Sequence, residues 1–336
     1  MRVPAFCFGR TILYWDTVLL VFAALSCALA LCAAYRANGG RRRALLVLLP
    51  LGAALSFVLA RLLYFYCHSE QFVSLAAAMA DGSAVSFCVV GAVCGFVLAV
   101  LALRALRLVP DAALLLDCAA PALALGLALA RLSALFNDAC RGKAILRDPR
   151  FFRLPFAVAE SGRGEYRFAA FFAGALGFAL AFLLLLQRFG RLYPARRKPR
   201  GRRGDVFLSF LLLLGTEEML VDSMRNDASF FPFNAFISMA QLFSAAFLLL
   251  VLILYSRRAI RARGARGSDL LVWLGWALGL SGVGIAEYLV QRHAGWYLSC
   301  YTLMSAALAL LLLCTVFFRL SAERAEAAEA KEDCDP

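Results

Sequence analysis

Long apolar segments alternate with short polar ones along most of the chain. Nine segments are close to 20 residues long and nearly free of charge, at 17–35, 44–66, 84–103, 111–136, 168–187, 205–220, 235–255, 269–290 and 296–318. About 20 apolar residues in a helix cross a lipid bilayer. The sixth segment is the shortest and the most polar at its end. The pattern predicts an all-α, polytopic integral membrane protein with nine spans. Its hydrophobic content of 63% argues against a soluble enzyme.

Basic residues are concentrated in the connections between these segments. The odd-numbered connections hold 19 Lys and Arg, and the even-numbered connections hold 9. Because basic loops stay in the cytoplasm, we expect the N-terminus outside and the charged tail at 321–336 inside. The fourth connection, 137–167, is an exception with seven basic residues. Either it forms an outer segment that faces lipid headgroups, or the topology differs there. The net charge of +13 is distributed over these loops, so we predict no nucleic-acid partner.

Two arginines lie inside the apolar segments, near the ends predicted to face outward. Arg131 lies in the fourth segment and Arg61 in the second. A guanidinium at membrane depth is costly unless it has a partner, and its planar donors match the oxygens of a phosphate. One interpretation is therefore a phospholipid headgroup held between the two arginines. The alternative is that each side chain extends along its helix to the interface.

Charged residues also end the sixth segment, in the stretch GTEEMLVDSMRND. Glu218, Asp222 and Arg225 are spaced by four and three residues, which places them on one face of a helix. They either form a stripe of mutual ion pairs or face the same cavity as Arg131. Asp117 and Pro121, in the other half of the fourth segment, are expected to be structural. The eleven cysteines include no CxxC pair and no histidine cluster, so we predict neither a metal site nor disulfides.

Several ordered motifs resemble a known family. They are FGRTILYWDTVLL near the N-terminus, VSFCVVGAV, the stretch DCAAPALALGLALARLSALFNDACRGK, the loop DPRFFRLPFAV, RKPRGRRGDVFLSFLLLLGTEEMLVDSMRND, and FISMAQLFS. Together they resemble bacterial prolipoprotein diacylglyceryl transferase over about residues 8–255. The resemblance implies a seven-span transferase-like domain at 1–256, with 137–167 as an outer head segment. Two extra helices at 257–320 and the tail at 321–336 lie beyond it.

The resemblance implies transfer of a diacylglyceryl group from phosphatidylglycerol to the lipobox cysteine of prolipoprotein signal peptides, in the bacterial cytoplasmic membrane. It implies membrane lipids as surroundings and no cofactor. The residues at matching positions give an expected catalytic set of Arg131, Asn137 and Cys88. The expected substrate-binding residues are Arg61, Asp222, Arg225, Gly142 and Glu218.

Six positions depart from the family pattern, among them Trp15, where a tyrosine is usual, and Asp222, which stands for a glutamate. Cys88 replaces a histidine, Ala134 an asparagine, Ala139 a glutamate, and Glu218 an arginine. These replacements leave three hypotheses open. The chain is a divergent active transferase, a catalytically silent relative that binds phospholipid or prolipoprotein, or a lipid transporter. The absence of an internal repeat weighs against the transporter.

Overall fold

The long helices of this computed structural model lie near the positions that the apolar pattern predicts. The structure describes residues 3–8, 11–80, 87–137, 141–145, 157–159, 165–194, 202–231, 234–292 and 297–332. Within them the long helices are α1 (Trp15–Ala37), α2 (Arg42–Cys67), α4 (Val89–Ala105), α5 (Ala112–Ser133), α6 (Ala170–Leu192), α7 (Asp205–Met224), α8 (Met239–Arg263), α9 (Gly267–Arg292) and α10 (Tyr297–Glu332). Short helices also occur, namely η1 (Ser69–Gln71), α3 (Leu75–Ala80) and η2 (Ala134–Phe136).

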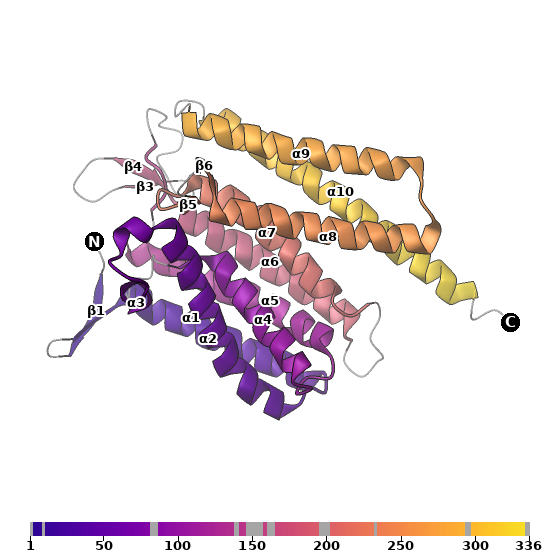
Figure 1. Cartoon of the computed structure of the whole chain (residues 1–336), viewed down its shortest axis with the longest axis horizontal. Coiled ribbons are helices and arrows are strands. Elements are labelled where there is room, and N and C mark those ends of the chain that lie inside the picture. The colour runs from indigo at the N-terminus through magenta and orange to yellow at the C-terminus, as the bar shows by residue number, and fades with distance from the viewer. Residues whose placement is uncertain are drawn as a thin grey trace.

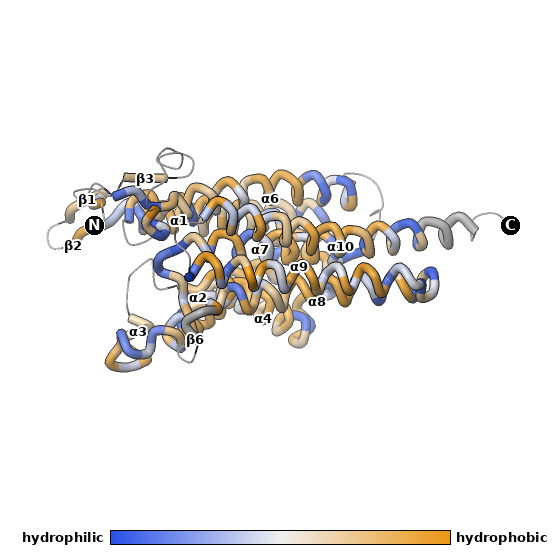
Figure 2. Tube along the Cα trace, turned by 90° about the horizontal axis from the view of Figure 1, so that it is seen from above, coloured by the Kyte–Doolittle hydropathy of each residue, from blue (hydrophilic) through white to orange (hydrophobic). Residues whose placement is uncertain are grey.

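Seven of the described helices are long and apolar enough to span a membrane, and α4 and α7 run alongside them (Figure 1). The helix α4 has 17 residues, and α7 carries Glu217, Glu218 and Asp222 near its end. Apolar residues occupy the middle of the bundle and polar residues gather at its two ends (Figure 2). These features confirm the prediction of an all-α, multi-pass membrane protein.

Three small antiparallel hairpins lie at one end of the bundle and were not predicted. They are β1 (Pro4–Phe8) with β2 (Thr11–Tyr14), β3 (Ala157–Ala159) with β4 (Tyr166–Phe168), and β5 (Phe230–Phe231) with β6 (Asn234–Ser238). The segment predicted at 235–255 therefore begins as a strand, and its helix starts only at Met239. The last helix, in contrast, continues to Glu332, well into the expected tail.

The two chain ends lie at opposite ends of the bundle. The N-terminal strand, α3 and the hairpins are at the left in Figure 1, and the C-terminus is at the right. This arrangement is the one that alternating passes with an odd number of spans would produce. We call the end with the N-terminus and the three hairpins the hairpin end, and the opposite end the C-terminal end.

Glycines allow close packing between neighbouring helices. A Cβ added at Gly91 in α4 would lie 2.8 Å from the carbonyl oxygen of Leu59 in α2. At Gly279 in α9 it would lie 3.0 Å from the Leu311 side chain in α10. Gly91 with Gly95, and Gly275 with Gly279, are each spaced by four residues, a spacing that favours close helix packing.

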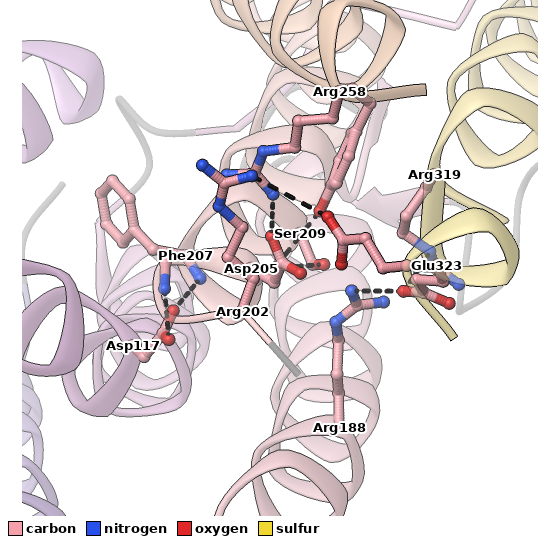
Figure 3. Close-up of polar contacts among 12 residues, drawn as sticks. Asp117, Arg188, Arg202, Asp205, Phe207, Ser209, Arg258, Arg319 and Glu323 are labelled. Atoms are coloured by element: carbon pink, nitrogen blue, oxygen red, sulfur yellow. Dashed lines mark hydrogen bonds and ion pairs between the residues drawn. The ribbon is translucent and has the colours of Figure 1, made fainter. Parts of the chain in front are cut away.

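A buried carboxylate fixes the start of α7. Asp117 of α5 accepts hydrogen bonds from the backbone N–H groups of Gly204 (2.7 Å) and Phe207 (2.9 Å) and from the Tyr193 hydroxyl (2.6 Å). Gly204 directly precedes α7 and Phe207 lies in its first turn (Figure 3). The N–H groups at a helix start have no partner within the helix, and Asp117 supplies one. The expected structural role of Asp117 is confirmed. It holds α7 against α5, and this positions the charged end of α7.

Candidate functional site

A cavity of about 350 Å³ lies at the hairpin end of the bundle. Its walls come from α1, α4, α5, α6 and the segment that follows α7. Four of the eight predicted site residues line it, namely Cys88, Arg131, Asn137 and Arg225. Apolar neighbours such as Leu20, Leu127 and Phe171 form much of the remaining surface. A mostly apolar cavity with a few convergent polar groups is typical of a ligand site.

Arg131 pairs with Glu218 through one nitrogen, while another nitrogen, Nε, makes no hydrogen bond to a described residue. Its Nη2 donates to Oε1 of Glu218, a carboxylate on α7 whose side chain is only 1% exposed. Its Nε is buried and makes no hydrogen bond to any residue that the structure describes. The Arg131 side chain also packs on Gly174 of α6, where an added Cβ would lie 3.2 Å from Arg131 Cδ and 3.3 Å from its Nε. Arg131 is thus pinned on one side while a donor remains for an anion.

The charged stripe at the end of α7, formed by Glu218, Asp222 and Arg225, is only partly paired within itself. Glu218 pairs with Arg131, and Asp222 accepts a hydrogen bond from the Ser238 hydroxyl at the start of α8. The distance from Arg225 Nη1 to Asp222 Oδ1 is 3.9 Å, an ion pair without hydrogen-bond contact. The interpretation of the stripe as mutual ion pairs is wrong for Glu218. The other interpretation was that the stripe faces the same cavity as Arg131. Arg225 does line this cavity with Arg131, whereas Asp222 and Glu218 lie outside its lining.

Ser238 joins Asp222 to a capping box. The Ser238 hydroxyl accepts from the backbone N–H of Gln241 (3.1 Å), and the Gln241 side chain accepts from the Ser238 N–H (3.1 Å). This reciprocal pair defines the start of α8. The motif FISMAQLFS therefore contributes a rigid helix start that orients Asp222.

Asp227 is a cavity residue that the sequence analysis missed. Arg225 donates to both of its carboxylate oxygens, from Nε (3.0 Å) and from Nη2 (2.9 Å). Burial would raise the pKa of the Asp227 carboxyl, but the charge of Arg225 and these hydrogen bonds hold it below its ordinary value. Asp227 therefore stays ionised and fixes the guanidinium at the cavity wall. Its place two residues after Arg225 in the charged stretch was the available signal.

Asp16 is a second residue that the sequence analysis missed. It is fully buried in the first turn of α1 and lines the cavity. Its Oδ2 accepts from Nδ2 of Asn137 at 3.3 Å, and its Oδ1 accepts from the backbone N–H of Thr17 at 2.8 Å. An acidic residue directly before an apolar segment resembles an ordinary helix start, and this concealed its link to Asn137.

Gly142 lies behind the cavity rather than in it. It forms a β-bridge with Arg225, and its N–H donates to the carbonyl of Phe168 at 2.9 Å. An added Cβ would lie 2.7 Å from the carbonyl oxygens of both Met224 and Phe168. The position therefore requires the close backbone approach that only glycine permits.

Cys88 and Arg61 differ in their position relative to the cavity. Cys88 precedes α4, is 7% exposed, and lines the cavity. Arg61 is buried in α2 and lies outside the lining, with its guanidinium carbon 4.1 Å from the ring centroid of Phe87. Phe87 itself lines the cavity. Of the two arginines in the two-arginine interpretation, the structure therefore places Arg131 in the cavity lining and Arg61 outside it.

Part of the predicted site lies outside the described residues. Asp138, Ala139 and most of the loop 137–167 belong to this group, as do the residues at 81–86. Ala134, which replaces a family asparagine, lines the cavity.

Comparison with protein families gives one match. The family model described as prolipoprotein diacylglyceryl transferase matches residues 4–257. The match includes every residue discussed in this site and ends within α8, so α9 and α10 lie beyond it. A comparison with curated proteins found no match.

Proposed function

The chain belongs to the prolipoprotein diacylglyceryl transferase family, and we propose that it transfers a diacylglyceryl group from phosphatidylglycerol to the lipobox cysteine of prolipoproteins. This activity belongs to lipoprotein biosynthesis in a membrane. Its donor is an anionic phospholipid, and its acceptor is a thiol in a signal peptide.

The state of Arg131 is the observation that carries the proposal. Arg131, whose buried Nε makes no hydrogen bond to any described residue, lines an apolar cavity together with Arg225 and Asn137. Charge-assisted hydrogen bonds to a phosphate would satisfy that donor and stabilise the leaving group. We assign Arg131 to the donor phosphate, and we assign Asn137 and the Arg225–Asp227 pair to positioning the donor headgroup.

The proposed reaction balances without a cofactor. The acceptor sulfur forms a bond to the glycerol carbon that carries the phosphate ester, and the bond between that carbon and the ester oxygen breaks. The products are a thioether and glycerol phosphate. The thiol proton leaves with the phosphate monoester or with water, since the second pKa of a phosphate monoester is about 6. A histidine at position 88 is therefore not essential, although the thiol loses a base suited to neutral pH.

A second candidate function is supported by the charge at position 218. Glu218 occupies one side of Arg131, so a donor phosphate must share the guanidinium with a carboxylate. Cys88 also offers no base comparable to histidine. A silent relative that binds phosphatidylglycerol or a prolipoprotein without reaction would tolerate both features.

We further propose that the protein lies in the bacterial cytoplasmic membrane with the cavity end outside. The support is the concentration of basic loops at the opposite end, which would face the cytoplasm. Within this arrangement residues 1–256 form the transferase domain, 257–320 an added helix pair, and 321–336 a charged segment.

Complementation tests the proposal in a cell. The chain would be expressed in a Gram-negative host whose essential transferase has been depleted, and prolipoprotein lipidation would be followed by mass spectrometry. We expect lipidation that Arg131→Ala abolishes and that Asp269→Asn, a change at the other end of the bundle, leaves intact. Well-folded, inserted protein that gives no lipidation while still binding phosphatidylglycerol would support the silent relative instead.

A further inference from the structure

A second cavity of about 850 Å³ lies at the C-terminal end of the bundle, far from the first. It forms a groove with α6 and α10 as walls and α7 as floor, and we call it the basic groove. One wall, α10, lies outside the residues matched by the family model. The basic groove therefore depends on a helix that the family match does not include.

The basic groove has a charged part and an apolar part. Arg188, Arg191, Arg202 and Arg319 line the charged part. Farther along the helices, Leu184, Leu213, Leu312 and Val316 line the apolar part. The groove therefore presents cations at the end of the bundle and a hydrophobic surface toward its middle.

Among the described residues, the groove lining holds four arginines and three carboxylates, Asp205, Glu323 and Glu326. Glu323 on α10 accepts from Arg188 Nη2 at 3.1 Å and lies 3.5 Å from Arg319 Nε (Figure 3). Asp205 on α7 pairs with Arg258 of α8, and Glu326 on α10 lies 3.8 Å from Nη1 of Arg202. Arg188 and Arg319 thus share the single carboxylate of Glu323.

Two of these arginines retain unused donors. The Nε atoms of Arg188 and Arg319 are buried and make no hydrogen bond with any part of the chain that the structure describes. Their side chains are 16% and 24% exposed. The Nε of Arg319 has only a longer ion-pair contact with Glu323, at 3.5 Å. A buried guanidinium donor that makes no hydrogen bond is costly, and an anion at this point would accept a hydrogen bond from both Nε atoms.

We propose that the basic groove binds an anionic phospholipid of the adjacent leaflet, with its phosphate between Arg188 and Arg319 and an acyl chain along the apolar part. The dimensions support this occupant. Leu312 and Glu323 are eleven residues apart, about 17 Å along a helix at about 1.5 Å per residue. Half of a bilayer hydrocarbon core is about 15 Å thick, so the charged and apolar parts match one leaflet. A free phosphate would leave the apolar part unused.

Photo-crosslinking tests this proposal by location. The full-length protein would be incubated with phosphatidylglycerol that carries a diazirine in one acyl chain, and the adducts would be mapped by peptide mass spectrometry. We expect adducts on α6 and α10 near Leu184 and Leu312. Phosphatidylcholine with the same photoreactive chain should label these peptides weakly, because its headgroup is neutral overall.

Matched variants give the proposal its controls. Combining Arg188→Gln with Arg319→Gln should reduce labelling about thirtyfold, since each basic residue near an anionic lipid contributes about a fivefold factor. Arg324→Gln, an exposed change on the same helix, should leave labelling unchanged. Glu323→Gln removes the competing carboxylate and should increase labelling severalfold. Because Glu323 is 45% exposed, this variant remains informative if the double variant fails to fold.

Three outcomes would overturn the proposal. Equal labelling by phosphatidylglycerol and phosphatidylcholine would reduce the groove to a nonselective apolar surface. If labelling is unchanged in Glu323→Gln and in a folded Arg188→Gln, Arg319→Gln double variant, then the two arginines do not bind the lipid and only connect α6 to α10. Displacement of the lipid by inorganic phosphate, at a concentration at which sodium chloride of the same ionic strength does not displace it, would indicate a free-phosphate site. None of these outcomes depends on transferase activity.

Discussion

Substituting Glu218→Gln separates the two roles of Arg131, as a partner of Glu218 and as a ligand for phosphate. The change removes one negative charge and preserves the size of the side chain. The Gln carbonyl can still accept the hydrogen bond from Arg131 Nη2. If the donor phosphate binds the opposite side of the guanidinium, removing the Glu218 charge should strengthen lipid binding.

The size of the effect follows from the geometry. Two charge-assisted hydrogen bonds of about 2.8 Å on opposite sides of one guanidinium separate the carboxylate and the phosphate by about 7 Å. At an effective dielectric constant of about 20, the repulsion between two unit charges at that distance is about 2 kcal/mol. Phosphatidylglycerol should therefore bind the variant about thirtyfold more tightly.

The same substitution should lower the stability of the lipid-free protein. Glu218 is 1% exposed, and replacing an ionic partner of a buried guanidinium with an amide weakens a charged hydrogen bond. We expect a loss of about 1–3 kcal/mol in the free energy of unfolding. Bound lipid should restore part of it, because a ligand that binds only the folded state stabilises that state.

Titration of a short-chain phosphatidylglycerol by microscale thermophoresis, paired with thermal unfolding, would measure both effects. Asp269→Asn, which removes one negative charge from the distant start of α9, controls for net charge. If a folded Glu218→Gln protein binds the lipid within twofold of the original protein, then the phosphate does not lie on Arg131.

Three further expectations test the surroundings of the site. Gly142→Ala should cost about 1–3 kcal/mol of stability through overpacking. Gly190→Ala lies within α6 and has nothing within 4 Å of the added Cβ, so it should raise the stability by up to about 1 kcal/mol in thermal unfolding. The Asp227 carboxyl has a folded pKa below its ordinary value of 3.8, so its pairing with Arg225 stabilises the fold above about pH 5, and this contribution declines as pH falls below about 4. The stability advantage over Asp227→Asn should follow that profile, and an advantage that does not change between pH 3 and 7 would contradict it. In intact cells, single cysteines in the connection between α4 and α5 should resist a membrane-impermeant thiol reagent, while those between α2 and α4 should react; the reverse pattern would invert the topology.

The helices were predictable because the length of an uninterrupted apolar segment is enough to identify a span. Their ends were less predictable where apolar residues continue past the helix. At Ser238 the apolar pattern runs through the strand β6 into α8, and only the Ser-x-x-Gln spacing of Ser238 and Gln241 indicates the helix start. The short hairpins gave no signal, since strands of a few residues bounded by polar turns resemble loops.

The sequence indicated some of the residues that line the cavity but not the pairs that they form. Arg131 was identified because a charged group at membrane depth needs a partner, Arg225 because it lies in the charged stripe, and Asn137 because of the family resemblance. The partner of Arg131 could not be identified, because Glu218 lies 87 residues away and reaches it only through the packing of α7 on α5. Asp16 is 121 residues from Asn137, and Arg61 lies behind Phe87 for a similar reason. Such contacts depend on helix rotation, which local spacing does not determine.

Transfer by the purified protein tests the central claim most directly. Phosphatidylglycerol labelled in its headgroup would be incubated with the protein and a lipobox peptide, and both thioether peptide and released glycerol phosphate would be measured. The proposed function predicts one glycerol phosphate for each thioether, with both products lost in Arg131→Ala and kept in Asp269→Asn. Folded protein that binds phosphatidylglycerol but forms neither product would contradict it.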